Sequence, residues 1–199
     1  MAYGTNGPFG LQARQFISGD AWDGQTNEYP IASGYNTNIF NGDPVYYANN
    51  GTIVRATAGA GNPIAGVFSG AKYIDTSGNQ VYAPFWPANT VTFQGANATA
   101  FIIDDPNVLF DVQAATTIAG GITAANLYEN ANIDFTTAGS TISGQSGATI
   151  SGLGNGATLQ VKIMRFTPNP KNAPGIQNNN VLVLINNSPL KGGTGTVGV

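Results

Sequence analysis

The side chains that carry most enzymatic chemistry are scarce in this sequence. It contains no His and no Cys, so it lacks the commonest general base near neutral pH and the usual thiol nucleophile. The missing Cys also excludes disulfides and Cys-ligated zinc. The serines have no His partner, and no GxSxG nucleophile turn occurs. We therefore predict no catalytic residue, and a protein that is not an enzyme.

One adjacent acidic pair, Asp104-Asp105, stands out. Neighbouring residues of a strand point to opposite faces, so these carboxylates are not expected to converge. Pro106 follows directly, which favours a turn. A metal cluster needs more oxygen ligands from nearby positions, and no EF-hand-like spacing is present. We predict no metal site and no cofactor.

The run from Gly193 to Gly198 matches the letters GxGxxG. In a dinucleotide-binding fold this motif opens a helix whose N-terminus receives a phosphate. Only Val199 follows in this sequence, so no such helix is expected. We interpret the match as fortuitous and predict no nucleotide site.

The composition favours association over chemistry. Charged residues make up 9 % of the chain, against roughly 25 % in ordinary soluble domains. A surface with so little charge offers little electrostatic repulsion against association. The alternative is a monomer whose surface is polar but uncharged. The seven Lys and Arg are dispersed and the net charge is −3, which argues against nucleic-acid binding. The longest aliphatic run, 181–185, is far too short to span a bilayer, so no membrane partner is expected.

Two hairpins are predicted near the middle of the chain. Residues 64–74 and 80–86 are β-prone arms around Asp75-Thr-Ser-Gly-Asn79, whose Asp, Asn and Gly are typical of turns. Residues 45–47 and 52–55 flank Asn49-Asn-Gly51, and Asn-Gly between β-branched and aromatic residues is a strong hairpin signal.

The remaining pattern is also that of short strands. We expect strands at 91–93, 97–103, 108–112, 158–166 and 181–185, the last of them buried on both faces. The only helical turn or two is expected at 124–130. Many short strands with a turn about every ten residues predict an all-β fold, a compact β-barrel or sandwich.

The domain organisation follows from where Gly and Pro gather. Residues 1–30 are rich in both, so a helix is unlikely there on propensity and a regular strand is not expected. They also hold many aromatic anchors, which indicates an extended irregular arm, draped over a partner or packed on its own domain. We predict a body over 31–191 with a Gly/Ser/Thr-rich loop at 139–157, and a flexible tail over 192–199.

Several segments together resemble one known family. They are GPFGLQAR (7–14), Tyr29 with GYNTNIFNGDPV (34–45), IAGVFSGAKYID (64–75) with Trp86, FIIDDPNVLFDVQ (101–113) and VLVLINNSPL (181–190). This order of segments is similar to that of the capsid decoration, or cement, proteins of tailed bacteriophages. The resemblance implies a β-barrel-like, β-tulip-like body on the outer surface of the phage head in the virion. It also implies binding to the major capsid protein, homotrimer formation, and no catalysis or cofactor.

The resemblance and the aromatic arm together suggest which residues face the capsid. The interface candidates are Phe9, Leu11, Arg14, Phe16, Tyr29, Ile31, Ile39 and Phe40. The expected function is a structural virion protein that stabilises contacts between capsomers.

The alternative function is a head-fibre or receptor-binding module that binds carbohydrate. Its sequence support is a set of aromatics, Tyr46, Tyr47, Phe85 and Trp86, that could form a sugar-stacking platform. The same residues are more often part of a core.

Overall fold

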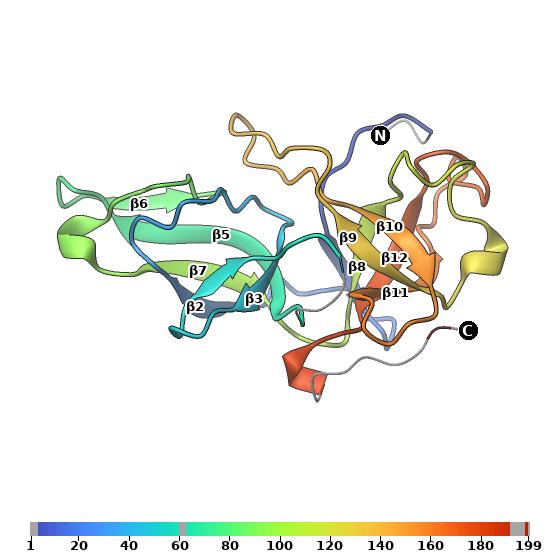
Figure 1. Cartoon of the computed structure of the whole chain (residues 1–199), viewed down its shortest axis with the longest axis horizontal. Coiled ribbons are helices and arrows are strands. Elements are labelled where there is room, and N and C mark those ends of the chain that lie inside the picture. The colour runs from blue at the N-terminus through green and yellow to red at the C-terminus, as the bar shows by residue number, and fades with distance from the viewer. Residues whose placement is uncertain (1–3, 60–62, 192–197, 199) are drawn as a thin grey trace.

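The chain folds into two antiparallel β-sheets, in agreement with the predicted all-β class. The computed structural model describes residues 4–59, 63–191 and 198. The two sheets occupy the two ends of the long axis of the molecule (Figure 1). One sheet is built from a single continuous stretch, residues 27–103, whereas the other combines residues 108–185 with the N-terminal strand at 12–16.

Sheet A contains six strands. In spatial order these are β1 (Gln12–Phe16), β8 (Val108–Gln113), β12 (Asn180–Ile185), β11 (Val161–Phe166), β9 (Asn130–Asp134) and β10 (Thr149–Gly154). The sheet curls until β10 approaches the end of β8, where Ala114 and Ile150 form a single parallel bridge. One bridge is not a continuous ladder, so the sheet is strongly curved but not a closed barrel.

Sheet B is built around the longest strand, β5 (Gly66–Ile74). Its path runs β2 (Asn27–Ile31), β7 (Ala98–Ile103), β5, β3 (Pro44–Tyr47) and β4 (Ile53–Arg55), and β6 (Gln80–Ala83) pairs with the far end of β5. β2 contains Pro30, which has no N–H to donate. An edge strand tolerates proline because an N–H on its outer side would have no partner strand.

Both predicted hairpins are confirmed. The β5–β6 pair closes over the Asp75 turn, where the carboxylate accepts hydrogen bonds from the backbone N–H groups of Ser77 and Asn79, each at 2.9 Å. Gly78 adopts a φ of +87°, which only glycine takes without strain. The β3–β4 pair closes over Asn50, whose side-chain oxygen accepts from the Thr52 hydroxyl at 2.7 Å.

Each sheet has its own hydrophobic core. Sheet A packs around Phe110 on β8 and the apolar faces of β9 to β12. Sheet B packs around Phe68 and Trp86, neither of which is exposed. Val67 and Ile103, at the ends of β5 and β7, join the core of sheet A, so the two sheets meet over apolar contacts.

The segment 139–157 connects the two sheets. Its second part forms β10, and the loop 139–148 crosses to sheet B. The backbone of Asn41 donates to the Gly144 carbonyl and accepts from the Ser146 N–H, both at 2.9 Å. A Cβ on Gly139 would lie 2.2 Å from the Phe40 ring. The small residues of this loop are therefore required by its close approach to sheet B.

Several sequence expectations are wrong. Residues 91–93 form no strand; a 3₁₀ turn, η1 (Phe93–Gly95), lies there, with Gln94 at a φ of 51°. The expected helix at 124–130 is reduced to the 3₁₀ turn η2 (Ala124–Asn126), because β9 already begins at Asn130. The strand expected from residue 158 begins at Val161. Another 3₁₀ turn, η3 (Pro189–Lys191), follows β12.

The N-terminal segment also differs from expectation, because regular strands were not expected there. β1 pairs with β8 and β2 pairs with β7. Most Gly and Pro residues of this segment lie outside β1 and β2, so these two stretches can adopt the extended strand conformation. The segment is therefore packed on its own body, which was the alternative to an arm draped over a partner. Residues 192–197 and 199 of the predicted tail lie outside the described residues.

Candidate functional site

Most residues predicted to face a capsid are buried within this chain. The buried members of that set are Phe9, Leu11, Ile31, Ile39 and Phe40. Leu11 belongs to the core of sheet A, and Ile31 and Ile39 to that of sheet B. In this conformation these side chains have no surface to offer a partner.

The other members lie at least partly at the surface, but they do not form one patch. Arg14 is exposed and forms an ion pair with Asp111 at 3.6 Å. Phe16 packs on the core of sheet A and lines a cavity described below. Tyr29 donates a hydrogen bond to Asp104 at 2.6 Å and packs beside Tyr47.

The aromatic residues suggested as a sugar platform are not assembled as one. Trp86 is not exposed at all, and its edge contacts Tyr73. Phe85 stacks on Phe40 with ring centroids 5.5 Å apart. Only Tyr46 and Tyr47 line a common surface hollow. This suggestion is wrong for Trp86, because the side chain fills the core of sheet B.

Four of the exposed large apolar side chains lie at the far end of sheet B, while others, such as Ile142 at 98 % exposed, lie elsewhere. We call this region the distal tip and define it by Ile74, Tyr82, Val91 and Phe93, which are 49, 69, 59 and 41 % exposed. The end of the β5–β6 hairpin and η1 lie together at this end of the molecule (Figure 1). A cavity of about 360 Å³ lies between them and is lined by Ile74 and Phe93.

The charged side chains at the distal tip already have partners within the chain. Lys72 forms an ion pair with Glu28 at 2.8 Å. Asp75 accepts hydrogen bonds from its own turn; these bonds, first that of the Asn79 backbone, lower the pKa of its carboxyl. The apolar side chains of the tip are therefore not surrounded by free charges.

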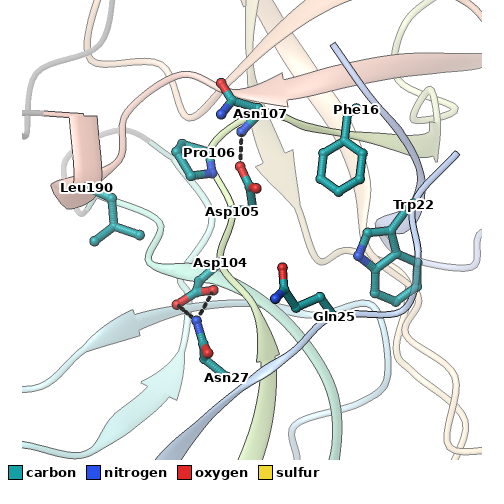
Figure 2. A pocket seen from close by; sticks show the side chains of 9 residues that line it. All are labelled: Phe16, Trp22, Gln25, Asn27, Asp104, Asp105, Pro106, Asn107 and Leu190. Atoms are coloured by element: carbon teal, nitrogen blue, oxygen red, sulfur yellow. Dashed lines mark hydrogen bonds between the residues drawn. The ribbon is translucent and has the colours of Figure 1, made fainter. Parts of the chain in front are cut away.

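A second feature is a cavity where the two sheets meet, which we call the inter-sheet cavity. Its volume is about 430 Å³. Figure 2 shows Phe16 and Trp22 on one side and the turn 104–107 facing them, with Gln25 between. The lining residues are Phe16, Trp22, Gln25, Asn27, Asp104, Asp105, Pro106, Asn107 and Leu190.

The carboxylates of this cavity are held in place by local hydrogen bonds. Asp104 accepts from the Asn27 amide at 2.9 and 3.1 Å and from the Tyr29 hydroxyl. Burial, and then the hydrogen bond to Asp104, raise the pKa of Tyr29 well above its ordinary value, so Tyr29 stays a donor. Asp105 accepts from the Asn107 backbone N–H at 2.7 Å.

The sequence prediction for Asp104-Asp105 is correct in one part and wrong in another. The pair does form a turn, with Asp105 as its hydrogen-bond acceptor. Both carboxylates nevertheless line the same cavity. The alternation argument does not apply because β7 ends at Ile103, so the pair lies outside the strand.

Neither region offers a recognisable catalytic arrangement. Within residues 4–59, 63–191 and 198, no three His, Cys, Asp or Glu side chains are grouped to hold a metal ion. The same described residues include no helix with the length and apolarity needed to cross a membrane. What the inter-sheet cavity supplies is hydrogen-bonding groups beside an aromatic wall.

Comparison of the chain with protein-family models, with curated proteins and with solved structures finds no match.

Sequence reasoning missed the residues that matter most at both features. Phe93 is expected in a strand and Trp22 in an irregular arm; Tyr82 does lie in the expected strand, but its exposure at the tip is not predicted. The available signal at the tip was the hairpin length, since β5 continues past Lys72, the last of its residues that pairs with β7. No local pattern indicates that Trp22 and Asp105 share a cavity.

Proposed function

We propose that this chain is a structural protein of a tailed-phage virion. It binds the outer surface of the head through the major capsid protein and stabilises contacts between capsomers. The proposal combines the family resemblance of the sequence with one observation, the exposed apolar distal tip. No enzymatic role is proposed.

The composition of the distal tip supports a protein-binding role. Contiguous exposed apolar side chains on a soluble protein mark interaction surfaces. The centres of protein interfaces are enriched in aromatic residues and depleted of charge, which matches Tyr82 and Phe93 beside the engaged Lys72 and Asp75.

The edge of β6 supports the same role. In the described part of the chain, β6 pairs with β5 and no strand covers its other side. Its four residues carry no charge, so charged side chains, one of the features that usually block edge pairing, are absent from this strand. An extended segment of a capsid protein can add to this edge by backbone hydrogen bonds.

We further propose that several copies act together on the shell, as trimers around local symmetry axes. Many weak contacts per shell then reinforce one another without high affinity at each. Light scattering of the purified protein, coupled to size exclusion, measures the oligomeric state directly.

Shell binding by tip variants tests the function. Tyr82→Asp and Phe93→Asp place a charge at the tip and are expected to abolish co-sedimentation with undecorated phage shells. Tyr128→Asp is the matched control, because Tyr128 is 51 % exposed and lies in the connection from η2 to β9, on sheet A. The control is expected to decorate shells fully and to raise their melting temperature as the natural protein does.

Two results would contradict parts of this proposal. If the natural protein stays in the supernatant while folded, the capsid role is rejected. If all three variants decorate shells equally, the capsid role stands and the distal tip is not the contact surface.

A further inference from the structure

We infer that the inter-sheet cavity is a binding site for a neutral sugar ring. The lining residues place the cavity where the two sheets meet, whereas the distal tip is at the far end of sheet B, so this inference does not depend on the capsid role.

The size and wall of the cavity suit one hexose or a short saccharide. Its volume of about 430 Å³ lies within the range of small-molecule sites, roughly 300–1,000 Å³. Phe16 and Trp22 form one wall (Figure 2). Aromatic rings offer apolar area with low conformational entropy, which the C–H face of a sugar can cover.

The polar groups of the cavity provide both donors and acceptors. Figure 2 shows the indole nitrogen of Trp22 directed toward the side where Gln25 and Asp105 lie. Neither the Trp22 N–H nor the Gln25 side-chain amide has a hydrogen-bond partner among the described residues. One Asp105 oxygen accepts from Asn107, and no partner is found for the other in the described part of the chain.

The balance of these groups selects the ligand class. Asp104 and Asp105 line the cavity, and no Lys or Arg does so among the described residues, so an anionic ligand is repelled. Lys191 lies near enough for the charge of Asp105 to raise its pKa, against the larger lowering effect of burial. A cation would make no use of the Trp22 N–H and the Gln25 amide donors, which water reaches because Gln25 is exposed and Trp22 is partly exposed. A hydroxyl both donates and accepts, so a neutral polyol satisfies both sets.

The cavity is pre-organised by hydrogen bonds among its own lining residues and to Tyr29 beside it. Asp104 is fixed by Asn27 on β2 and by Tyr29, which packs beside Tyr47 on β3. Asp105 is fixed by its own turn. Groups held in place before binding lose less conformational entropy when a ligand arrives. For a single sugar ring we expect a Kd on the order of 1–10 mM.

The chain contains two tryptophans, which gives the experiment an internal control. The indole N–H signals of ¹⁵N-labelled protein are assigned with the Trp22→Phe variant. The protein is then titrated with the methyl glycosides of glucose, galactose, mannose and N-acetylglucosamine. We expect at least one of them to shift the Trp22 signal saturably, while the signal of Trp86, which is fully buried, stays in place.

Variants and other ligand classes complete the test. Gln25→Ala is expected to weaken binding about tenfold, whereas Gln94→Ala, an exposed glutamine at the distal tip, leaves it unchanged. Linear oligosaccharides of the binding hexose distinguish a polysaccharide ligand, which binds more tightly than the monomer, from a free sugar, which does not. The inference is overturned if no neutral glycoside shifts Trp22 up to roughly 50 mM. It is also overturned if only sialic acid or a primary amine does so, or if Gln25→Ala binds normally.

Discussion

The Asp43 carboxylate and the Arg55 guanidinium form a buried ion pair, with Nε and Oδ2 2.8 Å apart. Asp43 has no exposed surface. Its other oxygen accepts from the hydroxyl of Ser146, on the loop that crosses from sheet A. Arg55 also lies 4.2 Å above the centre of the Phe135 ring, just after β9. Both members of this ion pair therefore also contact residues next to sheet A: Asp43 through Ser146 and Arg55 through Phe135.

Neutralising Asp43 should strongly destabilise the fold. Asp43→Asn leaves Arg55 without its counter-ion, and breaking a buried pair costs about 3–5 kcal/mol. The free energy of unfolding from urea denaturation measures this loss. Glu28→Gln, which breaks the exposed pair with Lys72, is the control and should leave the urea midpoint unchanged. Equal effects of the two variants would show that Asp43 does not stabilise the junction.

Stability should depend on pH through Asp111. Burial raises the pKa of its carboxyl, against the lowering effects of the Thr167 hydroxyl at 2.7 Å and the Arg14 guanidinium. Between the unfolded value near 3.8 and the raised value, the folded chain binds more protons than the unfolded chain. The contribution of Asp111 to the free energy of unfolding therefore grows as pH falls through the raised pKa, and is lost as pH rises through it.

The matched variant for this prediction is Asp111→Asn, which cannot titrate. Urea unfolding is measured for both proteins at several values from pH 7 down to the unfolded pKa. The free energy of unfolding of the natural protein, minus that of Asp111→Asn, should increase as the pH falls. The opposite change would mean that the Thr167 hydroxyl and Arg14 together lower the pKa of Asp111 more than burial raises it.

Leu11 should behave as a core residue and not as part of a detachable arm. It is 1 % exposed and lies in the core of sheet A, so Leu11→Ala should cost about 2–5 kcal/mol of unfolding free energy. Ile17→Ala is the control in the same segment, because Ile17 is 49 % exposed, and should change stability by less than about 0.5 kcal/mol. A Leu11→Ala protein of normal stability would indicate that the segment does detach.

The loop 139–148 should tolerate no side chain at Gly139. The added Cβ of Gly139→Ala would meet the Phe40 ring at 2.2 Å, and Phe40 is held by its stack with Phe85. Such overpacking costs about 1–3 kcal/mol, measurable by thermal or urea unfolding. Gly7→Ala is the control, since nothing lies within 4 Å of its Cβ position. A stable Gly139→Ala protein would show that the loop can lift from sheet B.

Local chemistry explains what could be predicted from the sequence. The Asp75 and Asn50 turns bond their own neighbouring backbone, so both hairpins follow from a few consecutive residues. The strands β8 and β12 follow from apolar runs at the expected length. These signals were enough for the all-β class and for most strands.

The tertiary structure decided which partner each apolar residue contacts. Phe9 and Leu11 could cover a capsid or their own core, because burial of apolar area is non-directional. Trp86 could likewise stack on a sugar or fill sheet B, and in this fold it fills sheet B. The sequence by itself determined most of the strands and the turns of both hairpins. The two cavities, the Asp43–Arg55 junction and the distal tip depend on contacts between residues far apart in the chain, which no local pattern encodes.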